Sequence, residues 1–111
     1  MKLQDVFEAH DYPEYVCKKD VRKLNVRAKN IGNFDCSGCT ELRTLIGAPE
    51  KIHGIFDCSK STKLSNLIGT PQEGITHFDC YGCTGLTLLY GTPTKIDGRF
   101  DIHDCSILIS L

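Results

Sequence analysis

A repeat of 22 residues runs through residues 31–111 of this 111-residue chain and constrains its fold more than any other feature. The tripeptide Phe-Asp-Cys begins at Phe34, Phe56 and Phe78, and Phe100 begins a fourth copy in the same register. A repeat of this length forms one supersecondary unit, which buries its apolar side chains only by stacking on its neighbours. We therefore predict a solenoid of stacked units that start at residues 34, 56, 78 and 100.

The repeated unit reads Phe-Asp-Cys-x-x-Cys-Thr-x-Leu-x-x-Leu-x-Gly-x-Pro-x-x-Ile. The Phe and the first Cys alternate with outward positions, which is the pattern of a strand with one buried face. The two leucines are three residues apart and favour a helical or irregular turn, after which Gly and Pro turn the chain back. Each unit is expected to supply one short strand to a single parallel β-sheet.

This unit resembles the leucine-rich repeat. Phe stands at the first strand leucine of that family and Cys at the second. The family's Asn or Cys position is filled here by Cys39, Ser61, Cys83 and Cys105. The unit style is most similar to the short cysteine-containing repeats of small tailed-phage and bacterial proteins. The resemblance implies an α/β repeat solenoid over residues 31–111.

Residues 1–30 are predicted to form a helical N-terminal cap with a degenerate repeat. Terminal units of a solenoid need such a cap, because otherwise their apolar row faces water. Leu3, Val6 and Phe7 share one face of a short helix. Asp11-Tyr12-Pro13 would end this helix, and a second segment would run from Pro13 to about Lys23. Three further residues match the spacing of the unit's leucines and isoleucine: Val21, Leu24 and Ile31.

The seven cysteines leave a metal site, disulfides and small buried side chains as alternatives. Cys36-x-x-Cys39 and Cys80-x-x-Cys83 have the spacing of zinc knuckles. However, the second unit has Ser in place of its second Cys, and the last unit has Ile in place of its first. We interpret the cysteines as packing residues that also satisfy backbone groups of the turn, with no cofactor. A zinc protein that uses both knuckles is the alternative function.

Aspartate occupies the second position of every unit and predicts a row of carboxylates on the outer face of the sheet. Like charges on adjacent strands repel, so backbone hydrogen bonds, a basic partner, or calcium or magnesium must offset them. The outward positions beside this row differ between units, which in a repeat scaffold indicates a recognition surface. The predicted partner-binding face consists of Asn33, Asp35, Ile55, Asp57, His77, Asp79, Tyr81, Arg99, Asp101 and His103.

These patterns predict a non-catalytic module for binding another protein. No set of repeat positions assembles a nucleophile, a base and an oxyanion donor, so we expect no enzyme. The family resemblance implies a small phage effector that binds and inhibits a host protein, such as a defence component. It would then act in the host cell cytoplasm.

Composition excludes several other classes. The chain is 41% hydrophobic and 24% charged with a net charge of -1, which fits one small domain. No apolar stretch approaches the roughly 20 residues that cross a bilayer, and no signal-peptide core is present, so we expect a cytoplasmic protein without a membrane partner. Six of the 13 basic residues lie between Lys18 and Lys29, but no reading motif accompanies them. We therefore expect no nucleic-acid partner.

The sequence at the C-terminus is more apolar than the repeat requires. Ile107 and Ile109 occupy positions that are mostly polar in the other units, and Leu111 is the last residue given. Exposed apolar strips mark association surfaces. We predict a homodimer, or a partner docked on the last unit, through Ile107, Ile109 and Leu111.

Overall fold

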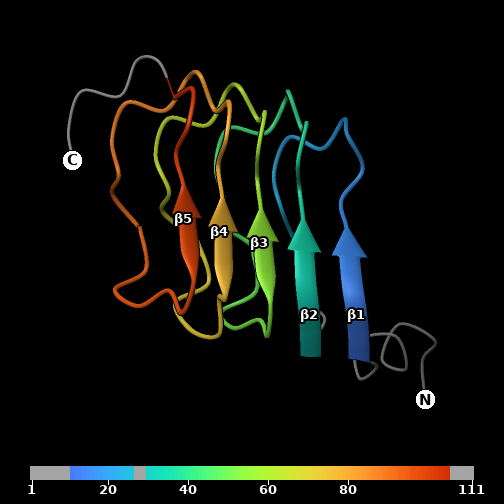
Figure 1. Cartoon of the computed structure of the whole chain (residues 1–111). Coiled ribbons are helices and arrows are strands. Elements are labelled where there is room, and N and C mark those ends of the chain that lie inside the picture. Colours follow the sequence, from blue (N-terminus) through green and yellow to red (C-terminus); the bar gives the residue numbers. More distant parts are fainter. Residues whose placement is uncertain (1–10, 27–29, 106–111) are drawn as a thin grey trace.

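The computed structural model describes residues 11–26 and 30–105, which form one parallel β-sheet (Figure 1). Its strands are β1 (Asp11–Val16), β2 (Asn30–Asp35), β3 (Ile55–Asp57), β4 (His77–Asp79) and β5 (Arg99–Asp101). Their order in the sheet is their order along the chain. The predicted single sheet of short parallel strands is therefore confirmed.

A column of aromatic rings fixes how β2 to β5 align. Phe34 pairs with Phe56, Phe56 with Phe78, and Phe78 with Phe100. Neighbouring ring centroids are 5.1 to 5.3 Å apart, and the first three rings are fully buried. A shift of one residue would move each ring to the outer face of the sheet, so the burial of these rings specifies the register.

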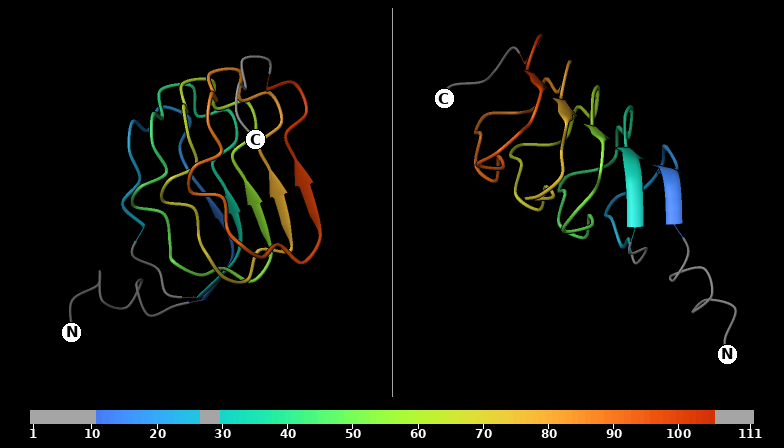
Figure 2. Two further views of the ribbon diagram at one scale, coloured as in Figure 1. Left: turned by 90° about the vertical axis from the view of Figure 1, so that its left-hand side faces the viewer. Right: turned by 60° about the horizontal axis from the view of Figure 1, so that its bottom comes forward.

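After each strand the chain turns away and returns behind the sheet (Figure 2). The leucines of the first two returns are buried in one core with the aromatic column, as Leu42 and Leu45 are together with Ile52. The described residues contain no helix. In the first full return, Gly47 has a φ of 102° and Pro49 follows two residues later. Both lie so close to the leucines that too few residues remain to nucleate a helix.

The helical cap predicted for residues 1–30 is not supported. Residues 11–16 form β1, the rest of 11–26 is irregular, and residues 1–10 lie outside the described residues. The Tyr15 ring stacks on Phe34 at 5.6 Å, and Cys17 is buried two residues later. Inward positions two residues apart require a strand, so this segment adds one more coil to the sheet.

The spacing of 22 residues is not supported as a rule for the whole sheet. Tyr15 pairs with Phe34, only 19 residues further along the chain. In a later return, Gly74 adopts a φ of 86° and the buried isoleucine follows it as Ile75, one position later in the unit than Ile52. The coils therefore stack in one sheet although their lengths and returns differ.

Candidate functional site

The ten residues of the predicted partner-binding face all lie on the outer side of the sheet or in the turns directly after its strands. The four aspartates pair along the sheet as one row from β2 to β5. Ile55, His77 and Arg99 pair in the row that precedes it. Tyr81 and His103 lie in the turns that follow β4 and β5. The structure therefore brings these residues together on one face.

Each aspartate of the row holds the turn that follows its strand. Its Oδ1 accepts a hydrogen bond from the backbone N–H two residues later, at 2.8 to 2.9 Å in every case. The donors are Ser37, Ser59, Tyr81 and His103. This local bond is the reason that Asp suits the position, because it closes the turn without a neighbouring coil. The structural alternative for the row is confirmed, and the carboxylates still give the face a negative charge.

Asn33 also supports the backbone. Its side-chain Oδ1 accepts the N–H of Ile55 at 2.8 Å, across from β2 to β3. Ile55 itself presents an isoleucine side chain that is 42% exposed. Without the four aspartates and Asn33, five residues of the predicted face remain, and their side chains differ from coil to coil: Ile55, His77, Tyr81, Arg99 and His103.

Tyr81 is the centre of a surface cluster at the carboxyl ends of the strands. Lys60 Nζ lies 6.0 Å from the centroid of the Tyr81 ring, within the usual range of a cation–π contact, and the His103 ring centroid lies 5.7 Å away on the other side. The Asp104 carboxylate lies 3.4 Å from His103 Nε2. A hydrogen bond with Asp104 raises the pKa of Tyr81 above its ordinary value.

Two members of this cluster occupy strained backbone positions. Lys60 has a φ of 59° and Asp104 a φ of 61°, whereas the equivalent residues of the other two turns are Gly38 and Gly82. A side chain in this left-handed conformation costs about 1 kcal/mol relative to glycine. The chain therefore carries charged side chains beside Tyr81 at positions where glycine would be easier to accommodate.

The aspartate row gives a direct test of hydrogen bond against charge. Asp57→Asn keeps an Oδ1 acceptor for Ser59, so we expect its free energy of unfolding to stay within about 0.5 kcal/mol of wild type. Asp57→Ala removes the acceptor and is expected to cost about 1 kcal/mol. Urea denaturation of both variants measures the difference. Equal losses in the two variants would show that the charge, and not the hydrogen bond, is the structural contribution.

The cysteines form a ladder inside the turns. Three side chains at the second Cys position of the unit donate to the carbonyl of the coil before: Ser61 to Cys36 at 2.9 Å, Cys83 to Cys58 at 3.0 Å and Cys105 to Cys80 at 3.2 Å. All seven cysteines are free and buried. The interpretation of these residues as packing groups that satisfy backbone carbonyls is confirmed.

Burial makes these thiols poor nucleophiles and poor metal ligands. It raises the pKa of Cys17 to about 12 and that of Cys36 well above its ordinary range. The thiolate is the form that reacts and binds metal, so burial disfavours the reactive form of Cys17 and Cys36. Cys83 differs, because a hydrogen bond with the Cys58 side chain lowers its pKa. In addition, β3 separates the knuckles of β2 and β4, which places them about 10 Å apart. Within residues 11–26 and 30–105, no group of three or more His, Cys, Asp or Glu could hold a metal ion.

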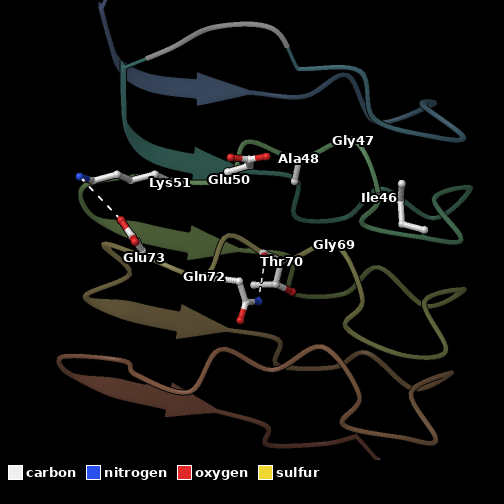
Figure 3. A pocket seen from close by; sticks show the side chains of 9 residues that line it. All are labelled: Ile46, Gly47, Ala48, Glu50, Lys51, Gly69, Thr70, Gln72 and Glu73. Carbon is white, nitrogen blue, oxygen red and sulfur yellow. Dashed lines mark hydrogen bonds and ion pairs between the residues drawn. The ribbon is translucent and has the colours of Figure 1, made fainter.

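A second surface on the return side was not predicted. The residue after the second leucine is apolar in three successive units and exposed in each: Ile46 at 60%, Ile68 at 46% and Tyr90 at 65%. Beside it lies a pocket of about 630 Å³ between two neighbouring returns, and the Lys51–Glu73 ion pair of 3.9 Å stands at one end (Figure 3). The repeated apolar residue was the signal in the sequence that could have revealed this row.

The predicted association edge of Ile107, Ile109 and Leu111 lies outside the described residues. In the part of the chain that the structure describes, no helix is long and apolar enough to cross a membrane.

Comparison with known proteins adds no family to this description. No protein-family model matches the chain, and neither the curated proteins nor the solved structures contain a match.

Proposed function

We propose that this protein is a non-catalytic module that binds another protein through the outer face of its sheet. The observation that carries the proposal is a constant aspartate row, held by the same hydrogen bond in four turns, between rows whose side chains differ from coil to coil. Constant positions hold a repeat scaffold together, and variable outward positions are where such scaffolds carry recognition.

The chemistry of the face points to a partner with a basic surface. Four carboxylates follow one another along the sheet, and each uses one oxygen for its own turn. Ile55, Tyr81 and Arg99 flank them and belong to residue types that anchor protein interfaces. The charged side chains of Lys60 and Asp104 lie beside Tyr81 and add polar groups to this face. A partner with lysines or arginines around an apolar centre would complement this pattern.

The resemblance of the repeat to short cysteine-containing leucine-rich repeats supports a more specific role. Such a protein, if encoded by a phage, would act in the host cytoplasm as an effector that binds and inhibits a host protein. Inhibition requires only that the outer face covers a surface that the host protein needs, so no catalytic group is involved.

Two matched pairs of variants test the binding face. Ile55→Ala and Tyr81→Ala change the outer sheet face, whereas Ile68→Ala and Tyr90→Ala remove the same residue types from the return side. The immobilised chain and its four variants are used to capture proteins from an extract of the native cells. We expect wild type and both return-side variants to capture the same protein. The captured amount should fall at least tenfold with each of the two sheet-face variants.

Thermal unfolding of all four variants verifies that each is folded. If capture persists with Ile55→Ala and Tyr81→Ala but fails with Ile68→Ala or Tyr90→Ala, the binding face is the return side and the proposal is wrong. A captured protein that survives all four substitutions would contradict it equally.

A further inference from the structure

The coil that ends in β5 leaves its apolar side chains less covered than the coils before it. Phe100 and Ile102 are only partly buried, whereas their counterparts Phe78 and Cys80 are fully buried. Leu89 in the preceding return is partly buried in the same way, although its counterpart in the coil before is fully buried. Among the described residues the aromatic column ends at the Phe100 ring, whose neighbour in the column is Phe78 at 5.1 Å.

The outward backbone N–H and carbonyl groups of β5 have no further strand to pair with among the described residues. After each earlier strand, the N–H of the next residue donates to the following coil at 2.7 to 2.9 Å, as Cys80 does to the carbonyl of Asp101. The equivalent residue of the last coil is Ile102, and among residues 11–26 and 30–105 no strand lies beyond β5. Alternate residues of a strand direct their backbone groups to the same edge, so Phe100 presents its N–H and carbonyl there too.

The charges of β5 distinguish it from the other strands. β5 reads Arg-Phe-Asp, whereas β3 reads Ile-Phe-Asp and β4 reads His-Phe-Asp. A permanent cation therefore occupies the first position of the edge strand but not of the strands inside the sheet. An identical strand placed alongside in parallel would bring Arg opposite Arg and Asp opposite Asp. In antiparallel pairing centred on Phe100, each Arg99 would instead lie opposite the Asp101 of the second copy.

We propose that two copies of this protein associate by antiparallel pairing of their β5 strands about a two-fold axis at Phe100. The two Phe100 residues exchange N–H···O hydrogen bonds, and their rings continue the aromatic column from one copy into the other. Two Arg99–Asp101 pairs flank them on the outer face. The second copy covers the edge that β5 forms in the described sheet, and unpaired strand edges are the places where further strands pair. The contact uses residues 99–102. Arg99 and Asp101 also belong to the proposed partner-binding face, but self-association does not depend on that proposed role and is measured without a partner.

The contact involves only one end of the stack, so we expect a moderate affinity. An interface limited to one coil lies at the small end of specific interfaces, which corresponds to a dissociation constant of about 10 µM. Sedimentation velocity from about 1 to 200 µM should then show a rise from 12.4 kDa towards twice this mass, with no larger species.

Charge reversal tests the pairing itself. Arg99→Glu places like charges opposite each other twice, and so does Asp101→Lys; we expect each variant to weaken self-association at least tenfold. In an equimolar mixture, the introduced glutamate lies opposite the introduced lysine, and the native Asp101 lies opposite the native Arg99. The mixture is therefore expected to recover dimers of near wild-type affinity. Arg43→Glu, an exposed substitution of the same kind on the return side, should leave self-association unchanged.

Circular dichroism at low concentration establishes that each variant is folded before sedimentation is measured. A wild-type chain that stays at 12.4 kDa up to about 200 µM would overturn the proposal. So would dimers that tolerate Arg99→Glu, or a mixture that fails to recover them. A mass that grows beyond the dimer would indicate open head-to-tail stacking instead and would equally contradict a two-fold contact.

Discussion

Replacement of Gly69 by alanine is expected to lower the free energy of unfolding by about 3 kcal/mol or more. Gly69 has a φ of 103°, a conformation that side chains rarely adopt. A Cβ atom there would lie 2.4 Å from the backbone nitrogen of Ile46 and from the carbonyl carbon of Leu45. Both contacts are to the backbone of the neighbouring coil, so the clash can be relieved only if two coils move apart.

Gly38→Ala provides the matched control. Gly38 also has a positive φ, of 65°, but the atoms nearest to an added Cβ are those of the Lys19 side chain at 3.8 Å. Only the left-handed backbone conformation is then penalised, at about 1 kcal/mol. Guanidinium denaturation of both variants measures the two losses. If Gly38→Ala costs as much as Gly69→Ala, close approach between coils is not the reason for glycine in the return.

The sheet could be predicted from the sequence because the aromatic residue and the residue two positions later alternate with polar ones. From Phe34 onwards, every strand carries this signal at the same place in its unit. The first coil could not be predicted in the same way. Tyr15 replaces Phe, and the distance from Tyr15 to its partner Phe34 is three residues shorter than that from Phe34 to Phe56. Leu3, Val6 and Phe7 suggested a helix, and these three residues lie outside the described residues. The described segment 11–16, which was included in the predicted helical cap, is a strand.

The candidate face was predictable to a similar extent. The period of two in the strands placed Ile55, His77 and Arg99 on the outside, and the structure has them there. The sequence could not show that Asn33 accepts a hydrogen bond from Ile55, because this bond depends on how β2 and β3 align. The return-side row was missed for a different reason. Its residues, such as Ile46, follow a buried leucine in an irregular return, and no strand or helix period assigns a face to such a segment.

The cysteine ladder accounts for both residue types found at its positions. At the second Cys position the side chain donates to a carbonyl, and the Ser61 hydroxyl does this as the Cys83 thiol does. At the first Cys position the thiol fills a small apolar space, which an aliphatic side chain can also fill, as Ile102 does. Cysteine suits both positions as a small side chain with a weak donor. The same burial should make the fold sensitive to alkaline pH.

The free energy of unfolding is expected to fall steeply above about pH 9, and the chain should unfold before about pH 12. Burial raises the pKa of Cys17 from 9.0 to about 12, and it raises that of Cys36 and Cys80. The hydrogen bond with the Cys83 side chain, and burial, raise the pKa of Cys58 well above 9.0. At a pH between the unfolded pKa of about 9 and the raised folded pKa, the folded state binds more protons than the unfolded state. The contribution of these thiols to the free energy of unfolding is therefore full below about pH 9 and is lost as pH rises.

Each fully buried thiol then removes about 1.4 kcal/mol per pH unit, and Cys36, Cys58 and Cys80 together remove about 4 kcal/mol. Urea denaturation at pH 8, 9, 10 and 10.5 under reducing conditions measures the slope. Cys36→Val supplies the control, because the variant fills the same apolar space without a titrating group. We expect its slope to be shallower than that of wild type by about 1.4 kcal/mol per pH unit. A free energy of unfolding that is constant from pH 8 to 10.5 would show that the buried thiols do not govern the alkaline limit of this fold.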